Sequence, residues 1–336
     1  MAENTGIEWT DATVNFWWGC TKVGRGCDWC YAEAWAARYG EQLFGLGVPR
    51  RKIKSAVSLL YRLHNRASWW AADAYIGKLH PNGVRRVFIQ SMSDLFDKEV
   101  PAEWFDEAWQ AITACDKLEI QIVTKRVSLV EKRLAGRPWP KHAGLIISVV
   151  NQAEADRDIP RLLELKAKLG IPWIGVSLEP LLGAIDLTRI CIVPKVAGSH
   201  RAGIHIDALA GRYVESGQSY IGEWDVSGPY PESAPALALD WVIAGGESGK
   251  HARPMHPDWV RSLRDQCAAA GVPFLFKQWG EWLHSDQLGW WAHGDEAIER
   301  CASEGDFYRV GKRAAGRLLD GAEHNGFPIV SQETIA

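Results

Sequence analysis

The sequence predicts an α/β protein, a partial TIM-like β/α barrel of parallel strands. Two observations predict this fold. Short, nearly continuous apolar runs, typical of strands covered on both faces, alternate with longer segments of helical periodicity. Polar or acidic residues directly follow most of these runs, and in a parallel barrel such residues meet at one mouth. An open doubly wound sheet would give a similar alternation in two separate halves and stays an alternative.

The individual elements follow from these runs and from boundary residues. Strands are expected at Thr13–Trp18, Arg86–Gln90, Glu119–Thr124, Leu145–Val150, Pro172–Ser177, Trp241–Ala244 and Pro273–Phe276. Helices are expected near Trp29–Tyr39, Ser55–Ala72, Pro101–Cys115, Ser128–Leu134, Glu154–Leu169 and Pro257–Ala270. Pro101 is suited to a helix start, and Gly170 and Gly271 stand just past helix ends.

Two segments depart from this rhythm. Residues 191–237 are rich in Gly, Ser and Pro and are predicted to form an insertion between the fifth and sixth strands. From about Gln278 onward we recognise no clear strand, although four tryptophans lie there. We therefore predict a barrel over residues 1–280 and a C-terminal extension over 281–336 that packs on it as a cap.

Composition limits the functional classes. The chain has 336 residues, 47% of them hydrophobic, and a formal net charge of -3, so any nucleic-acid surface must be local. No apolar run approaches the roughly 20 residues of a membrane span, and the N-terminus lacks the pattern of a signal peptide. The seven cysteines do not resemble a disulfide framework. We expect a cytoplasmic protein without membrane contact; the sequence does not indicate its oligomeric state.

Three of the cysteines crowd into one glycine-rich stretch. Cys20, Cys27 and Cys30 follow a predicted strand and precede a predicted helix. Three thiolates suit a 4Fe–4S cluster with one open iron, to which a small molecule can bind. They also suit zinc, with a fourth ligand such as His64. Unligated buried thiols are the third interpretation. The strand–loop–helix setting at the head of a barrel favours the cluster.

Six segments carry a family resemblance: IEWTDATVNFWWGCTKVGRGCDWCYAE, QSMSDLFD, SLEPLLGAIDL, WVIAGGESGKHARPMHPDWV, FKQWGEW and VGKRAAGRLLDG. The cysteine segment is similar to the three-cysteine loop of the radical S-adenosylmethionine superfamily. The whole chain resembles a phage and prophage branch of largely unassigned function, which is distantly similar to spore photoproduct lyase. Two features depart from the usual pattern. The first cysteine gap is six residues rather than three, and Asn15–Trp17 lacks an expected proline.

The resemblance implies a radical mechanism. Cys20, Cys27 and Cys30 would ligate three irons of a 4Fe–4S cluster, and S-adenosylmethionine would chelate the fourth. Reductive cleavage would then give a 5′-deoxyadenosyl radical, with the electron supplied by an external donor. Glu179, Glu247 and Lys125 are implied as catalytic residues.

The resemblance also implies contacts to S-adenosylmethionine at strand ends and in the cysteine segment. The implied contacts are Trp29 to the adenine; Ser91, Ser93 and Asp94 to the methionine amine; Lys125 to the carboxylate; Ser148 or Asn151 to the ribose; and Ser177, Glu179, Gly245 and Gly246 around the pocket floor. Each has a structural alternative, because serines and aspartates at strand ends often cap helices and glycines often only permit turns.

Other residue patterns keep further functions open. Glu179 and Glu247 would face each other across a barrel mouth, as the acid and base of a glycoside hydrolase do. Segment 38–86 carries ten Lys or Arg against two acidic residues, with two tryptophans, and predicts a DNA or nucleotide surface. The preferred hypothesis is radical modification or repair of a nucleic-acid base, extruded or single-stranded. A zinc-stapled nucleic-acid-binding module is the non-enzymatic alternative.

Overall fold

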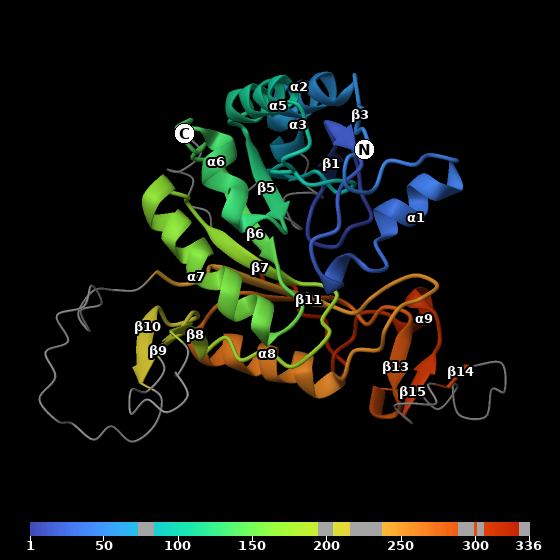
Figure 1. Cartoon of the computed structure of the whole chain (residues 1–336). Helices are drawn as coiled ribbons and strands as arrows, with labels where there is room; N and C mark the ends of the chain where they lie inside the picture. The colour runs from blue at the N-terminus through green and yellow to red at the C-terminus, as the bar shows by residue number, and fades with distance from the viewer. Residues whose placement is uncertain (73–83, 194–203, 216–236, 288–298, 301–305, 329–336) are drawn as a thin grey trace, which may run out of the picture.

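The computed structural model describes residues 1–72, 84–193, 204–215, 237–287, 299–300 and 306–328. Its centre is a seven-stranded sheet in the order β1-β4-β5-β6-β7-β11-β12, curled into a half-barrel (Figure 1). Every neighbouring pair in this sheet is parallel. The strands are β1 (Ala12–Val14), β4 (Arg85–Ile89), β5 (Leu118–Thr124), β6 (Ala143–Ser148), β7 (Ile174–Leu178), β11 (Trp241–Gly245) and β12 (Phe274–Gln278). The predicted partial barrel of parallel strands is confirmed.

Helices lie around the outside of the curved sheet (Figure 1). They are α2 (Ala56–Asn65), α3 (Ala67–Ala72), α5 (Ala102–Ala114), α6 (Val130–Leu134), α7 (Gln152–Leu169) and α8 (Pro257–Ala270). Their apolar sides share one large buried cluster with every second residue of the strands, such as Ile120 and Ile122 of β5. Within the described ranges, no helix is both long enough and apolar enough to cross a membrane.

The other face of the strands lines the inside of the half-barrel. Its lower layer is a compact cluster around Trp9, Trp173 and Trp241, together with Phe88, Ile146, Ile243 and Leu275. Gly144 permits this packing, since a Cβ there would lie 2.0 Å from the ring of Trp173. These tryptophans therefore fill the bottom of the barrel and are not available to stack a ligand.

The same inner positions become polar toward the carboxyl ends of the strands. Phe88, Ile146, Ile243 and Leu275 are each followed, two residues later on the same strand face, by Gln90, Ser148, Gly245 and Lys277. Lys125 and Ser177 occupy the equivalent positions after β5 and on β7. The inside of the half-barrel thus has an apolar floor and a polar mouth, and the mouth is where parallel barrels place their sites.

Two expected elements are divided. The segment expected as one strand over Thr13–Trp18 leaves the sheet after Val14 and forms β2 (Trp17–Trp18), antiparallel to β3 (Arg51–Lys52). The Asn15 side chain causes the departure, because it accepts the Met92 N–H and donates to Ser91 Oγ. The helix expected over Ser55–Ala72 is two helices, α2 and α3, separated at Arg66.

Small antiparallel sheets occupy the two irregular segments. The insertion contains β8 (Ile190–Val193), β9 (Ile204–Asp207) and β10 (Arg212–Glu215). The C-terminal segment contains β13 (Trp282–His284), β14 (Glu299–Arg300), β15 (Phe307–Arg309) and the short helix α9 (Lys312–Ala315). The expectation of no clear strand there is wrong, because strands of two or three residues are too short to leave a recognisable periodicity. The predicted domain boundaries stay predictions.

Candidate functional site

The three clustered cysteines lie on a loop that packs across the mouth. This cysteine loop, residues 19–30, follows β2, includes a 3-10 turn at Arg25–Cys27 and leads into α1 (Tyr31–Arg38). A Cβ at Gly26 would lie 2.6 Å from Val150 Cγ1 and 3.7 Å from Pro180 Cδ, so the loop rests on the segments after β6 and β7. Gly19 has φ +107°, and a Cβ there would lie 2.4 Å from Leu43 O. The glycines therefore let a long cysteine spacing lie flat on the barrel.

Cys27 and Cys30 are neighbours with free thiols. Burial raises the pKa of the Cys30 thiol, and the nearby Cys27 raises it further. The N–H groups of Glu33 and Ala32, in the first turn of α1, and the ammonium group of Lys125 act in the opposite direction and lower that pKa. The helix N-terminus and the lysine thus offset part of the effect of burial, which remains the largest and leaves the pKa of Cys30 above its usual value.

Cys20 is held by an arginine that the sequence analysis did not single out. Arg126 Nη1 donates to Cys20 Sγ at 3.4 Å, and Nη2 donates to Thr21 O at 2.6 Å. The same guanidinium lies 3.2 Å from Asp94 Oδ2 and 3.9 Å from Asp97 Oδ1. Burial raises the pKa of the Cys20 thiol to about 12, although Arg126 counteracts part of this shift.

The thiols of the cysteine loop can be compared with the ligands of a single metal ion and with those of an iron–sulfur cluster. Three free thiols on one loop are the right donors for an iron–sulfur cluster, and two of them are neighbours. Among the described residues, no three His, Cys, Asp or Glu side chains stand close enough to hold one metal ion. The case for a cluster therefore rests on donor chemistry, since three thiols on one loop are the ligands that a 4Fe–4S cluster with one open iron takes.

His64, the expected fourth zinc ligand, lies elsewhere. Its Nδ1 accepts the Lys117 N–H at 3.4 Å and is 3.9 Å from Asp116 Oδ1. Lys117 directly precedes β5, so His64 lies at the amino end of the sheet, whereas the cysteine loop lies at the carboxyl end. The structure does not bring His64 to the thiols.

The residues expected at the methionine amine form hydrogen bonds within the protein. Asp94 accepts from Phe96 N, Lys125 N and Thr124 Oγ1 and is ion-paired with Arg126. Ser93 Oγ donates to Trp17 O at 3.0 Å, and Ser91 Oγ accepts from Asn15. These bonds give all three side chains a structural role that joins β4, β5 and the segment before the cysteine loop. Their contact with a cofactor stays a prediction.

Asn151 and Gly246 also have structural explanations. Asn151 caps α7, with its Oδ1 accepting the Glu154 N–H at 3.0 Å. A Cβ at Gly246 would lie 1.8 Å from Trp279 O, so only glycine permits this approach of two backbones. A Cβ at Gly245 would lie 3.6 Å from Glu179 Cδ, which places Gly245 beside that carboxylate. Contact of Gly245 with a cofactor stays a prediction.

The two expected catalytic carboxylates each bind a cation of the protein. Both Glu179 oxygens accept from Lys277 Nζ, at 2.7 and 2.8 Å. Glu247 binds the Arg253 guanidinium through both oxygens, at 2.7 and 2.8 Å. Arg253 also reaches Asp28 Oδ2 and Arg25 O in the cysteine loop. Because protein cations occupy both carboxylates, the structure does not favour a glycoside hydrolase, and Arg253 instead clamps the loop to β11.

Two buried amides in the mouth keep an open polar atom. Gln90 Oε1 accepts the Phe16 N–H, and Gln278 Nε2 donates to Gly246 O. The other amide atom of each, Gln90 Nε2 and Gln278 Oε1, has no hydrogen-bond partner among the described residues. Buried polar groups normally have partners, so such atoms at the carboxyl ends of β4 and β12 are consistent with a polar ligand.

Aromatic residues border the mouth on the side of α1. The Trp29 ring lies 4.5 Å from the His251 ring, centroid to centroid, and is 47% exposed. The Tyr31 hydroxyl donates to Ser91 O. Burial raises the pKa of this hydroxyl, and the nearby Cys30 and Glu179 raise it further. Tyr31 therefore spans from the cysteine loop across the mouth toward β4 and β7.

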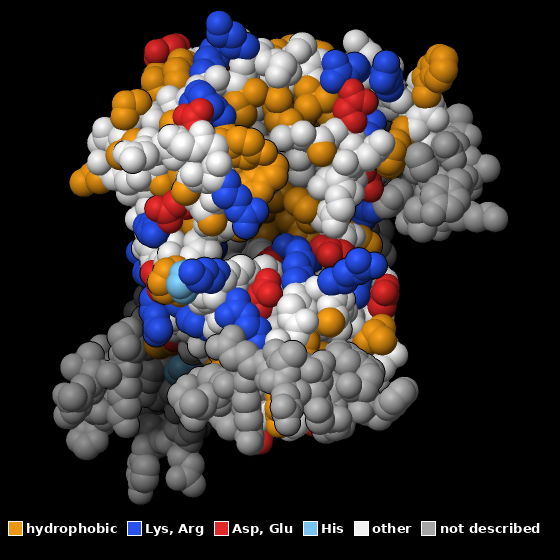
Figure 2. All heavy atoms as spheres, turned by 90° about the vertical axis from the view of Figure 1, so that its right-hand side faces the viewer, with side chains coloured by type: hydrophobic (Ala, Val, Ile, Leu, Met, Phe, Trp, Pro, Cys, Tyr) orange, Lys and Arg blue, Asp and Glu red, His pale blue; other side chains and the backbone are white. Residues whose placement is uncertain are grey.

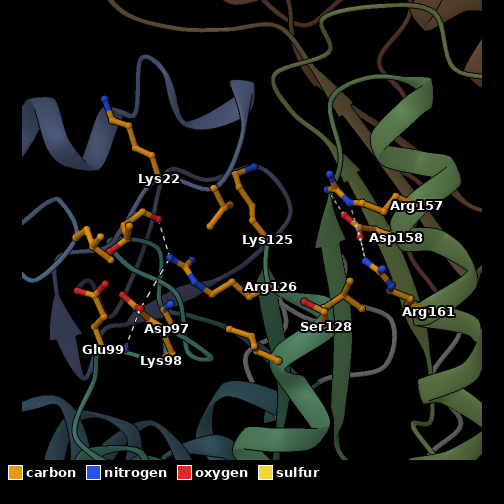
Figure 3. Close-up of a pocket in the computed structure, with 15 residues that line it drawn as sticks. Lys22, Asp97, Lys98, Glu99, Lys125, Arg126, Ser128, Arg157, Asp158 and Arg161 are labelled. Carbon is orange, nitrogen blue, oxygen red and sulfur yellow. Dashed lines mark hydrogen bonds and ion pairs between the residues drawn. The ribbon is translucent and has the colours of Figure 1, made fainter.

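A cavity of about 400 Å³ opens beside the cysteine loop, next to the β5–α6 connection and α7 (Figure 3). Its charged lining consists of the cations Lys22, Lys98, Lys125, Arg126, Arg157 and Arg161 and the acids Asp97, Glu99 and Asp158. Arg157 and Arg161 share the single carboxylate of Asp158. Lys125 has no ion-pair partner in the part of the chain that the structure describes. The size is that of a small-molecule site, and the surplus positive charge suits an anionic group.

The surface on this side is hollowed. Figure 2 shows the side that carries α1 and the C-terminal sheet, with hydrophobic side chains inside a central hollow and Lys, Arg, Asp and Glu side chains on its rim. A hollow with apolar walls and charged edges is the usual form of a ligand site in a barrel mouth.

Most cations of segment 38–86 form ion pairs with carboxylates of the same chain. Arg50 is buried between Asp97 and Glu99. The other pairs are Arg51 with Glu41, Lys52 with Glu107, Arg62 and Arg66 with Glu3, and Arg86 with Asp11. Lys78 lies outside the described residues. A nucleic-acid surface over this whole segment stays a prediction, and these pairs leave it less charge than the sequence indicates.

Fold and site together define a parallel half-barrel protein with a three-thiol loop at its mouth. The chain belongs to the family described as "Protein of unknown function (DUF5131)", whose model matches residues 4–328. No curated protein matches the sequence. Among solved structures, the chain is similar to a doubly substituted spore photoproduct lyase with bound AdoMet and dinucleoside spore photoproduct, at 16% identity. The match covers 50% of this chain and 45% of that one, with a TM-score of 0.29.

Proposed function

We propose that the protein is a radical S-adenosylmethionine enzyme, with a 4Fe–4S cluster held by Cys20, Cys27 and Cys30. The observation that carries the proposal is the placement of three free thiols on one loop across the mouth of a parallel half-barrel. When bound, such a cluster supplies an electron for cleavage of S-adenosylmethionine to a 5′-deoxyadenosyl radical. An external reductant provides that electron, and the cytoplasm keeps the thiols reduced.

The chain's own residues bind and orient the substrates. Lys125 lies near Cys30, where it offsets part of the pKa increase caused by burial, and it borders the charged cavity, so it is placed to hold the carboxylate of S-adenosylmethionine. The open amide atoms of Gln90 and Gln278 offer a donor and an acceptor at opposite sides of the mouth. Tyr31 and Trp29 border the mouth, where a bound substrate packed against them would be shielded from water, and such shielding protects a reactive intermediate from side reactions.

The ion pairs keep the site rigid. Arg253 ties Asp28 of the cysteine loop to Glu247, and Lys277 ties β12 to Glu179 at the end of β7. We propose positioning roles for these carboxylates in place of proton transfer. The substrate we propose is a nucleic-acid base or its modification, because exposed aromatics and free cations border the mouth.

The experiment is a cleavage assay on anaerobically prepared protein. After chemical reduction, the protein should release 5′-deoxyadenosine from S-adenosylmethionine. Cys30→Ala should abolish release, whereas Cys267→Ala, which changes a buried cysteine of α8, should retain it. Lys125→Met should weaken binding of S-adenosylmethionine, and Lys132→Met on the exposed side of α6 should not. Equal release by the Cys30 and Cys267 variants would refute the proposal.

A further inference from the structure

One face of α1 carries a row of exposed aromatic side chains. Tyr31, Trp35 and Tyr39 follow each other at intervals of four residues and therefore share one side of the helix. They are 56%, 49% and 66% exposed, respectively. The opposite side of α1 already supplies the buried Ala32 and Ala36. The row, which we name the α1 aromatic face, therefore leaves about half or more of each side chain open to solvent.

This face is continuous with the mouth. Tyr31 donates to Ser91 O at the end of β4. The Trp35 and Tyr39 rings meet edge to face at 5.7 Å, and Tyr39 meets Trp18 at 6.4 Å. Successive rings of the row are about 6 Å apart along the helix axis. The row thus leads outward from the cysteine loop at regular steps.

Charge on this part of the surface is positive. The acidic residues of the cysteine loop, α1 and the segment that follows are all ion-paired: Asp28 with Arg253, Glu33 with Lys22, and Glu41 with Arg51. Arg25 and Arg38 have no ion-pair partner within the described ranges. Arg38 stands three residues after Trp35, so it lies beside the aromatic face. Arg38 thus lies beside the row, and Arg25 lies in the cysteine loop that leads into α1.

We infer that the α1 aromatic face stacks successive unpaired bases of a single-stranded nucleic acid and leads one base into the mouth. Aromatic rings stack bases of any sequence, and flanking arginines bind the phosphates. A duplex hides the faces of its bases, so the strand must be single or opened. The uncompensated cations favour this occupant over a protein partner. The inference rests on the part of the proposed function that names a nucleic-acid substrate and is independent of the cluster.

The test is equilibrium binding of fluorescently labelled oligothymidylate, oligouridylate and a duplex to the full-length protein, without S-adenosylmethionine. We expect the single strands to bind more tightly than the duplex, and comparison of the two single strands distinguishes DNA from RNA. Trp35→Leu and Tyr39→Leu should each raise Kd about tenfold. Trp35→Phe should bind like the wild type. Arg38→Ala should reduce the slope of log K against log salt by about 0.7.

Matched controls separate stacking from general surface effects. Trp69 of α3 is 81% exposed and lies outside the face, so Trp69→Leu should not change Kd. Lys132→Ala should not change the salt slope. Thermal unfolding checks that each variant folds.

Three results would overturn the inference: no binding of single strands, equal binding of the duplex, or equal Kd for the Trp35 and Trp69 variants. Leucine retains apolar surface but has no ring to stack on a base. An unchanged Kd of the Trp35→Leu variant would therefore mean that the face acts as an apolar surface, of the kind that docks a protein. Release of 5′-deoxyadenosine from S-adenosylmethionine is measured separately on the wild-type protein. A wild-type protein that binds single strands but releases no 5′-deoxyadenosine removes the radical proposal alone, and one that releases 5′-deoxyadenosine but binds no single strand removes only the inference about the α1 aromatic face.

Discussion

Replacement of Arg126 by methionine tests the connection between the cysteine loop and the barrel. The Arg126 guanidinium lies 3.2 Å from Asp94 and 3.4 Å from Cys20 Sγ, and both side chains of the Arg126–Asp94 pair are only 6% exposed. Methionine retains most of the side-chain length but lacks the charge and the donors. Asp94 would then be a buried carboxylate without a cation.

The contacts that Asp94 and Asp97 keep determine how much unfolding free energy the Arg126→Met variant should lose. Removing one partner of a buried ion pair typically costs about 3–5 kcal/mol, because the other charge stays buried and unpaired. Asp94 keeps its bonds from Phe96 N, Lys125 N and Thr124 Oγ1. Asp97 keeps Arg50 at 2.9 Å. These remaining donors place the expected loss near the lower end, about 3 kcal/mol of unfolding free energy.

Urea unfolding followed by tryptophan fluorescence measures this loss. The control is Lys168→Met, which breaks the pair with Glu131 on the surface, where the side chains are 62% and 54% exposed. Surface pairs contribute about 0–1 kcal/mol, so the control should change little. Adding Asp94→Asn to the Arg126 variant should recover part of the loss. If the Arg126→Met and Lys168→Met proteins unfold with equal free energy, the reasoning about the buried network is refuted.

Three further predictions concern packing, capping and pH. Gly246→Ala should prevent stable folding, because the new Cβ would lie 1.8 Å from Trp279 O. Gly6→Ala, which has open space around the new Cβ, should fold and express normally. The yield of soluble protein is measured for both variants. Asn151→Ala should lower the free energy of unfolding by about 1 kcal/mol, measured in urea, and Asn151→Asp should restore it; no difference between them would contradict the cap. Burial raises the pKa of Glu119 from 4.5 to about 7. The folded state therefore holds this proton after the unfolded state releases it, and stability should fall by about 3 kcal/mol from pH 4.5 to 7, a fall that Glu119→Gln should remove.

The barrel was predictable because its signals are local. Buried parallel strands are continuous apolar runs, and the glycines after the helices are readable stops. Gly170 and Gly271 indeed end α7 and α8 with φ +63° and +71°. The early departure of the chain at Asn15 was not predictable, since it depends on hydrogen bonds to Ser91 and Met92, far along the sequence.

The site was predictable only in part. The cysteines were recognisable because three of them stand close together in the sequence. The cations that hold the site lie far from their partners: Lys277 is 98 residues from Glu179, and Arg126 is 106 from Cys20. Each follows or ends a strand, and this position is the signal that could have identified them. The exposure of α1 aromatic residues depends on which side of the helix meets the barrel, and a short helix does not reveal this.

The measurement that tests the central claim most directly is the metal content of protein purified without oxygen. The account predicts about four iron and about four sulfide per chain, and an electron paramagnetic resonance signal of the reduced protein that changes when S-adenosylmethionine is added. Replacement of Cys20, Cys27 and Cys30 by alanine should remove iron and signal together. Stoichiometric zinc without iron in the oxygen-free protein would contradict the account.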